Sequence, residues 1–212
     1  MRRLAYLLAL VFGLFAATAA TAATFPEAST PTDIVVGRPD ASVTIIEYGS
    51  VACPICARFD AAVMPALKAK YIDTGKARFI FRPMATGNPT VAFAGHLLAR
   101  CSGDKAFDVV QAIMHAQAEM DGSGPPEAYE NALPVFQRIA RSVGLSDDRF
   151  KQCLTDQQAI GLLDAAHQAA LDGGVAGTPT VYINGKELEL DDFDIGEFDR
   201  VLVPLTTKQT DL

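Results

Sequence analysis

Cys53 and Cys56 stand three positions apart in the stretch VACPICARFD, residues 51–60. A pair at this spacing can hold a metal ion, close a short loop, or exchange a disulfide with another molecule. The chain has two further cysteines, Cys101 and Cys153. Four cysteines allow three pairing patterns, and an even count permits all of them to pair in an oxidising compartment. The surroundings of each cysteine therefore have to distinguish these chemistries.

A metal site at the Cys-x-x-Cys motif is disfavoured by the rest of the sequence. A structural zinc ion takes four protein ligands, and this motif supplies two. The sequence contains neither a second Cys-x-x-Cys nor a pair of closely spaced histidines, since His96, His115 and His167 fall in separate predicted helices. We predict that the protein holds no metal and no other cofactor.

Cys53 lies where a predicted strand gives way to a predicted helix. The first helical turn leaves backbone N–H groups unpaired and carries a partial positive charge, which favours a thiolate over a thiol. Pro54 suits the first helical position because its missing N–H costs nothing there. Cys56 lies one turn deeper on the same side of the helix. We expect an accessible outer sulfur and a sheltered inner sulfur that can bond to each other.

Loop length distinguishes two bridges that the four cysteines could form. A Cys53–Cys56 bridge removes little entropy from the unfolded chain, roughly 2 kcal/mol, and is better suited to opening and closing than to holding the fold. A Cys101–Cys153 bridge closes about 52 residues and could stabilise the fold by roughly 4 kcal/mol. The spacings suggest one reactive bridge and one structural bridge.

The elements that must position Cys53 follow from the hydrophobic pattern. A short strand is predicted at 33–37, and a β-branched strand begins at Ser42. From Pro54, apolar residues at intervals of four predict a helix, which Pro65 should kink or end early. A strand over Ala77–Pro83 completes a strand–helix–strand unit, whose strands should lie parallel with a right-handed crossover.

Helices dominate the second half of the chain. Four helix-like segments without an intervening strand are Thr90–Arg100, Lys105–Gln117, Ala128–Ser142 and Asp147–Leu154. A further helix is predicted over Gln157–Leu171. A strand from Thr180, a tight turn at Asn184-Gly185 and a returning strand to Leu190 form a hairpin. The last predicted helix runs from Asp194, a candidate N-cap, to Leu205.

Composition and the first residues indicate one exported globular domain. The chain has 212 residues, half of them apolar, which is enough for one domain with an insertion. Its formal charge of -7, without a basic block, argues against binding to nucleic acid. Residues 1–22 combine two arginines, an apolar run and small residues, the order of a cleaved secretory signal; an uncleaved membrane anchor is the alternative. Residues 23–32 are predicted to be a flexible leader.

The combination of these motifs resembles the thioredoxin superfamily. The resemblance rests on a strand ending in IIEYGS, on CPIC opening a helix, and on a late GTPT that leads into a strand and an ING hairpin. The inserted helices resemble those of the periplasmic DsbA-type thiol–disulfide oxidoreductases. The resemblance implies an α/β, thioredoxin-like fold built from residues 33–87 and 156–207, with strand–helix–strand and helix–hairpin–helix units. Residues 88–155 would then be an inserted all-helical subdomain.

The resemblance also implies roles for individual residues. Cys53 matches the exposed nucleophile that forms a mixed disulfide with a client protein, and Cys56 matches the buried cysteine that resolves it. Thr178 and Pro179 match a cis-proline loop that lies beside the disulfide and offers backbone groups to a bound peptide. Glu47 matches a buried acid beneath the active site. Burial there predicts a raised pKa and a proton shuttle to the inner thiol, whereas a Glu47 at a sheet edge would simply be solvated.

Two positions depart from the strongly oxidising DsbA pattern. Those proteins have Pro-His between their cysteines, whereas this chain has Pro54 and Ile55. Ile55 cannot donate a hydrogen bond to a thiolate, so we expect a less favoured thiolate and a less oxidising bridge. Thr178 resembles the residue found in isomerase and reductase relatives.

Three functions are compatible with the sequence. The first is an oxidase that passes the Cys53–Cys56 bridge to exported clients with free or mispaired cysteines and is reoxidised by a DsbB-like membrane partner. The second is a periplasmic reductase or isomerase kept reduced by a DsbD-like donor. The third is a non-catalytic peptide-binding module or chaperone, which would not need both thiols. Isomerases usually carry an N-terminal dimerisation domain, and the predicted leader over residues 23–32 is too short to be one. We therefore favour a periplasmic oxidase, with a monomer as the default.

Overall fold

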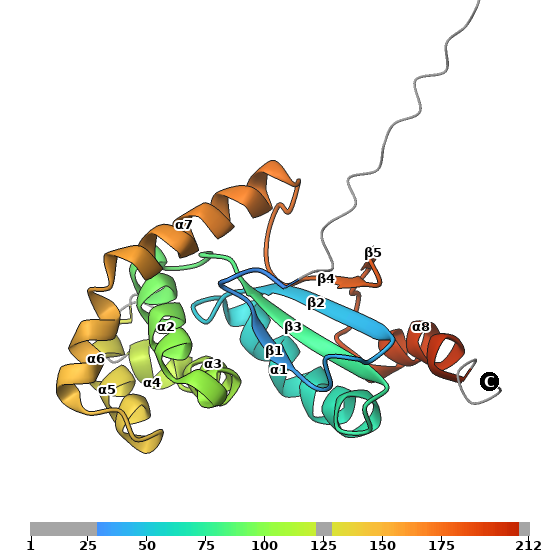
Figure 1. Ribbon diagram of the computed structural model, residues 1–212, viewed down its shortest axis with the longest axis horizontal. Helices are drawn as coiled ribbons and strands as arrows, with labels where there is room; N and C mark the ends of the chain where they lie inside the picture. Colours follow the sequence, from blue (N-terminus) through green and yellow to red (C-terminus); the bar gives the residue numbers. More distant parts are fainter. Residues whose placement is uncertain (1–28, 122–128, 208–212) are drawn as a thin grey trace, which may run out of the picture.

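The computed structural model describes residues 29–121 and 129–207 of the chain. The predicted signal and most of the predicted leader lie outside the described residues. Five strands form one sheet in the order β1-β3-β2-β4-β5. The helices within residues 89–121 and 132–154, called the helical block below, lie beside the sheet (Figure 1). No helix within the described ranges is long and apolar enough to cross a membrane. The α/β fold with inserted helices is as the sequence predicts.

The central strand of the sheet leads directly to the two neighbouring cysteines. The strands are β1 (Ile34–Val36), β2 (Val43–Gly49), β3 (Ala77–Pro83), β4 (Thr180–Ile183) and β5 (Lys186–Leu188). All seven residues of β2 are buried, as expected of a β-branched strand with neighbours on both sides. The predicted parallel pairing of β2 with β3 is confirmed. β1 pairs antiparallel with β3, and β4 pairs antiparallel with both β2 and β5.

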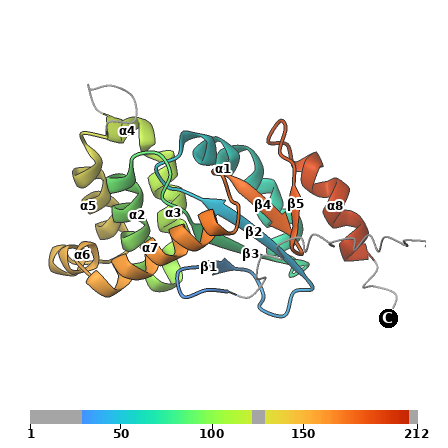
Figure 2. The same cartoon turned by 90° about the horizontal axis from the view of Figure 1, so that it is seen from above.

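Helix α1 (Pro54–Leu67) begins immediately after this strand and covers one face of the sheet (Figure 2). Its buried residues are Cys56, Phe59, Asp60, Val63, Met64 and Leu67. Pro65 lies inside the helix, where it cannot donate to the preceding turn. The helix runs two residues beyond Pro65 and then continues into the π-helical segment η1 (Lys68–Ile72).

The helical block follows β3 and contacts both α1 and the sheet edge. Its helices are α2 (Pro89–Cys101), the 3-10 turn η2 (Gly103–Lys105), α3 (Ala106–His115), α4 (Gln117–Asp121), α5 (Ala132–Ser142) and α6 (Asp147–Leu154). The helix predicted over Lys105–Gln117 is divided, because Ala116 leaves helical geometry with a ψ of 6°. The helix predicted from residue 128 begins at Ala132; residue 128 itself lies outside the described residues.

Helix α7 (Gln157–Asp172) returns the chain to the sheet on the face opposite α1. Ala170 and the following Val175 pack there against side chains of β2, β3 and β4. The turn at Asn184-Gly185 has positive φ at both residues, which the Asn-Gly pair tolerates. The returning strand ends at Leu188 rather than Leu190.

The last helix, α8 (Ile195–Thr207), packs against α1 on the same side of the sheet. Asp194 precedes it, and Asp194 Oδ1 accepts a hydrogen bond from the backbone N–H of Gly196 at 2.6 Å. The predicted capping position of Asp194 is therefore confirmed, because its carboxylate binds an N–H group in the first turn.

A disulfide joins the beginning and the end of the helical block. Cys101 at the end of α2 is bonded to Cys153 in α6, with a Cα–Cα distance of 5.9 Å and a sequence separation of 52. Cys153 is buried against the neighbouring helices. The bridge closes the long loop that the sequence suggested for a structural role.

We predict that replacing both cysteines, as Cys101→Ser with Cys153→Ser, lowers the free energy of unfolding by up to about 4 kcal/mol, because the unfolded chain regains the entropy of a long open loop. Urea unfolding of the oxidised wild type and the double variant measures this difference. An unchanged unfolding midpoint would show that the bridge does not contribute to stability.

Candidate active site

Cys53 is the N-cap of α1, and its sulfur sits at the open end of the helix. Cys53 Sγ accepts a hydrogen bond from the backbone N–H of Cys56 at 3.3 Å. Pro54 occupies the first helical position, as expected from its missing N–H. Both cysteines carry free thiols in this structure. The pair therefore has the arrangement of an outer sulfur at a helix terminus and an inner sulfur one turn below.

The outer sulfur is less open than the sequence suggested. Cys53 is 7% exposed and Cys56 is fully buried. Thr178, in the loop before β4, explains the difference, since Cys53 Sγ lies 3.4 Å from its carbonyl oxygen. Ile55, between the cysteines, is 41% exposed and forms an apolar surface next to the sulfur.

The environment shifts the pKa values of the two thiols in opposite directions. The pKa of Cys53 is lowered to about 6, and the largest cause is a hydrogen bond with the side chain of Cys56. Burial opposes this shift. Hydrogen bonds with Thr178 and with the backbone N–H groups of Cys56 and Ile55 lower the pKa further. Burial is the main cause that raises the pKa of Cys56 well above its ordinary value, and the neighbouring Cys53 and Glu47 contribute. At neutral pH the outer sulfur is a thiolate and the inner sulfur keeps its proton.

Three loops that are distant in sequence meet at Cys53. The Thr178–Pro179 peptide bond is cis. The hydroxyl groups of Thr178 and Thr86 share a hydrogen bond, and the Thr86 carbonyl accepts one from Ser50 Oγ at 2.8 Å. The loop before β4, the loop after β3 and the turn after β2 are thus linked around the sulfur.

A glycine lets two of these loops approach each other closely. A Cβ atom at Gly87 would lie 2.2 Å from the carbonyl oxygen of Ala52, and Gly87 has a φ of +77°. Any larger residue would push the loop after β3 away from the turn that carries Cys53.

Glu47 lies in the middle of the sheet, beneath α1. It stands opposite Phe81 of β3 and Val181 of β4 and is 2% exposed, so it is not a solvated edge residue. Within the described residues, no hydrogen-bond donor reaches its Oε1. Burial raises the pKa of Glu47 well above its ordinary value, and the charges of Asp60 and Cys53 raise it further. Burial therefore favours the protonated form of Glu47, which fits a proton donor.

The helical block contributes two residues that the sequence analysis missed. Gln117 Nε2 donates to the carbonyl oxygens of Val51 at 2.8 Å and Cys53 at 3.2 Å. Tyr129 Oη donates to the carbonyl oxygen of Ala52 at 3.1 Å. Three consecutive carbonyl groups in the turn before α1 thus accept hydrogen bonds from side chains of the helical block. In the sequence, Gln117 and Tyr129 are ordinary polar residues far from the cysteines, and no local signal indicates this contact.

Asp60 is a second buried acid that the sequence analysis missed. It follows Cys56 by one helical turn and is 3% exposed. Its Oδ1 accepts from Gln111 Nε2 at 2.9 Å, and its Oδ2 lies 3.0 Å from His115 Nε2. Burial raises the pKa of Asp60, opposed by Gln111 and His115. The signal in the sequence was an acid within the apolar stripe of α1.

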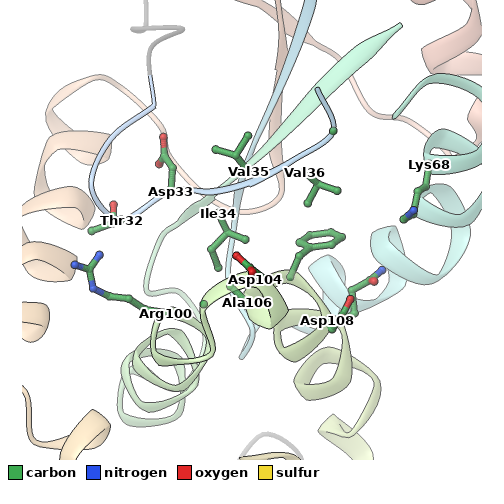
Figure 3. Close-up of a pocket in the computed structure, with 14 residues that line it drawn as sticks. Thr32, Asp33, Ile34, Val35, Val36, Lys68, Arg100, Asp104, Ala106 and Asp108 are labelled. Atoms are coloured by element: carbon green, nitrogen blue, oxygen red, sulfur yellow. The ribbon is translucent and has the colours of Figure 1, made fainter. Parts of the chain in front are cut away.

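A groove between β1 and the helical block lies apart from this chemistry (Figure 3). Ile34 and Val36 of β1 lie on one side of it, and Asp104 and Ala106 lie on the other. None of the predicted site residues, all of which belong to the described chain, lines this groove. The groove gives no reason to move the candidate site away from Cys53.

Comparisons with known proteins identify the family and the fold of this chain. The thioredoxin family model matches residues 29–199. A protein of Rickettsia typhi, provisionally named a protein-disulfide oxidoreductase, is 32% identical over 160 residues, which cover 74% of this chain and 56% of the relative. A Bacillus anthracis protein, provisionally named disulfide bond formation protein D, is 28% identical over 162 residues, covering 75% of this chain and 72% of the relative. This chain spans about half the length of the Rickettsia relatives.

Solved structures support the same assignment of the fold. The alpha-DsbA1 protein of Wolbachia pipientis superimposes with a TM-score of 0.71 and is 27% identical, covering 86% of this chain and 94% of that one. BdbD of Bacillus subtilis superimposes with a TM-score of 0.69 at 20% identity, covering 83% of this chain and 94% of that one, and shows the fold alone. The resemblance to thioredoxin-fold DsbA proteins that the motifs indicated is confirmed.

We predict that alkylation of the reduced protein by iodoacetamide occurs at Cys53 and that its rate rises with pH around a midpoint near 6, because the thiolate is the reactive form. Mass spectrometry after timed quenching locates the label and gives the rate. Cys56→Ala removes the main stabilising contact and should move the midpoint upward. A midpoint near the ordinary thiol value in the wild type would contradict this electrostatic description.

We predict that Gln117→Ala lowers the free energy of unfolding by about 1–3 kcal/mol, since the buried carbonyl group of Val51 loses this donor, while that of Cys53 keeps the N–H of Ala57. Gln168→Ala is the matched control, because Gln168 is exposed and bonds only to a neighbouring carboxylate on its own helix. Urea unfolding of both variants measures the difference. Equal stability of the two variants would mean that the turn before α1 does not need Gln117.

Proposed function

Since this chain belongs to the thioredoxin family and shares its fold with DsbA proteins, we propose that it is a protein thiol:disulfide oxidoreductase that exchanges a Cys53–Cys56 disulfide with cysteines of other proteins. The main support for the proposal is that the pKa of Cys53 is lowered and that of Cys56 is raised. A leaving group with a pKa of about 6 makes the outer sulfur easy to attack and easy to release. A buried inner thiol is protected from outside reagents.

The first step of the proposed reaction opens the bridge. A client thiolate attacks Cys53 Sγ of the oxidised protein, and a mixed disulfide forms between the client and Cys53. The bond between Cys53 and Cys56 breaks, and its electron pair remains on Cys56 Sγ. Because its pKa is raised, Cys56 takes up a proton, and protonated Glu47 supplies it.

The second step releases the oxidised client. A second client thiolate attacks the client sulfur of the mixed disulfide, and Cys53 leaves as a stabilised thiolate. The client loses two electrons and gains a disulfide, while the enzyme gains two electrons and becomes a dithiol. Of the two protons that the client thiols carried, one leaves to solvent, and the other balances the proton that Cys56 received through Glu47.

The proposed direction of the reaction is oxidation of the client. Stabilising the Cys53 thiolate favours the reduced enzyme and therefore the transfer of the bridge to a client. Ile55 offers the thiolate no donor, so we infer that the bridge is less oxidising than one with a histidine there. The second candidate function is a reductase or isomerase with a DsbD-like donor, which the resemblance at Thr178 favours. A simple peptide-binding module would not need thiols with opposed pKa values.

The proposed setting is the periplasm. The signal expected in residues 1–22 would direct export of the chain and would then be cleaved. The clients are exported proteins with free or mispaired cysteines. A DsbB-like membrane protein that passes electrons to a quinone would restore the bridge. We infer that the enzyme works as a monomer.

We predict that Cys53→Ser abolishes oxidation of a reduced exported protein, because it removes the sulfur that the client attacks. Cys56→Ser should stop the reaction too, since no bridge can form. The assay counts client thiols by trapping and mass spectrometry over time. The Cys101→Ser, Cys153→Ser variant is the control and should retain activity at temperatures where it is folded.

Two results would change the proposed function. Undiminished activity of both active-site variants would leave only peptide binding. Trapping of thiols in intact cells determines the direction: a resting enzyme with a closed Cys53–Cys56 bridge supports the oxidase, and a resting dithiol supports the reductase or isomerase.

A further inference from the structure

The loop after β3 presents Thr86 to the active site. The hydroxyl group of Thr86 is bonded to that of Thr178, whose carbonyl oxygen lies 3.4 Å from Cys53 Sγ. The carbonyl group of Thr86 accepts a hydrogen bond from Ser50 Oγ, in the turn before Cys53, at 2.8 Å. A side chain that fixes the backbone of this loop therefore also fixes the surroundings of the outer sulfur.

Helix α7 reaches this loop through His167. The backbone N–H of Ala85, next to Thr86, donates to His167 Nδ1 at 3.2 Å, although the two residues are 82 positions apart in the sequence. Ala170, one helical turn after His167, belongs with Met84 to the apolar cluster on the face of the sheet opposite α1. An apolar contact and a hydrogen bond thus attach successive residues of the loop to α7.

Helix α7 also carries the second loop at Cys53. It runs from the helical block toward the sheet (Figures 1 and 2). Residues 173–177 then lead the chain to the cis peptide bond between Thr178 and Pro179. One loop beside the sulfur is therefore joined to α7 by the chain itself, and the other is joined to it by His167.

We propose that His167 is a positioning residue for the reaction at Cys53. It holds the loop after β3 against α7, and this keeps the hydroxyl groups of Thr86 and Thr178 paired beside the sulfur. Its effect passes through the backbone of Ala85. This inference rests on the proposed function, since it concerns the same outer sulfur.

The contact requires a hydrogen-bond acceptor at the position of Nδ1. An imidazole nitrogen accepts only when it carries no proton, so the ring that binds Ala85 holds its hydrogen on Nε2. The Oδ1 atom of an asparagine is bonded to Cγ, as Nδ1 is, and can accept in the same place. A leucine branches at the same carbon and has no acceptor. His167→Asn and His167→Leu are therefore a matched pair that differs in this hydrogen bond.

Loss of the contact should weaken one of the interactions that stabilise the thiolate. A hydrogen bond with Thr178 is among the causes that lower the pKa of Cys53. If the loop after β3 moves, the Thr178 hydroxyl loses its partner on Thr86, and its contact with the sulfur is loosened. The hydrogen bonds from the backbone of Ile55 and Cys56 belong to α1 and should stay, so the expected effect is partial.

The test measures the rate at which iodoacetamide labels Cys53 as a function of pH in the reduced full-length protein. We expect His167→Leu to move the midpoint upward and to slow labelling at pH 6 by about twofold, since one of several stabilising hydrogen bonds is weakened. In a glutathione buffer at pH 7, the ratio of closed bridge to dithiol should rise by roughly twofold. His167→Asn should match the wild type in both measurements.

The controls distinguish positioning from a role in the stability of α7. Helix stability alone predicts that His167→Leu is the better variant, because leucine favours a helix more than asparagine does. Gln168→Leu should behave as the wild type, since Gln168 is exposed and bonds to Asp172 on its own helix. His167→Ala lacks the acceptor and favours the helix most, so it should shift as His167→Leu does and replaces it if that variant folds poorly.

A second measurement follows the route from His167 to the sulfur. In a Thr86→Val background the hydroxyl link to Thr178 is absent. His167→Leu should then cause no further shift of the Cys53 midpoint, because two changes on one route are not additive. Circular dichroism checks that each variant is folded at the temperature of labelling.

Three outcomes would overturn the proposed role. They are wild-type midpoints in His167→Leu and His167→Ala, an equal shift in His167→Asn, and a shift by His167→Leu that is undiminished in the Thr86→Val background. Labelling of Cys53 does not require exchange with a client, so these outcomes do not depend on the proposed function. A wild-type protein that fails to oxidise a reduced two-cysteine peptide would instead refute that function.

Discussion

The turn from β2 into α1 is the constraint on which the rest of the site depends. The backbone N–H groups of Ile55 and Cys56 can stabilise a charge on Cys53 only while this turn keeps its shape. Side chains from distant segments hold it, since Gln117 and Tyr129 bind its carbonyl groups. The helical block therefore takes part in the chemistry indirectly, because it fixes the geometry of the helix terminus at which the outer sulfur sits.

Burial acts in the opposite direction in the layer below this turn. Cys56, Glu47 and Asp60 lie between the sheet and α1, and burial raises the pKa of each. A negative charge that appears on Cys56 must therefore be met by a proton, whereas a charge on Cys53 needs none. One short stretch of chain thus separates an outer sulfur that is stable as an anion from an inner sulfur that keeps its proton.

Features that depend on neighbours in sequence could be predicted, and contacts between distant segments could not. The apolar strand before CPIC indicated that Cys53 opens a helix, and Asn184-Gly185 indicated the hairpin, because both signals are local. The direction of β1 and the contacts of Gln117 depend on how elements pack, which no local pattern records. Asp60 interrupted an apolar stripe, but its partner lies on another helix. The loop at Pro179 was expected from the family resemblance and not from the dipeptide itself.

The central claim is that the folded protein stabilises the Cys53 thiolate, and its most direct test is the free energy of unfolding of the reduced protein as a function of pH. Folding lowers the pKa of this thiol from 9.0 to about 6, so the thiolate contributes stability that is complete above the unfolded value and is lost as pH falls through the folded value. The difference between wild type and Cys53→Ser should therefore rise steadily from about pH 6 to about pH 9 and be constant below pH 6. A difference that is independent of pH across this range, or that falls as pH rises, would contradict the account.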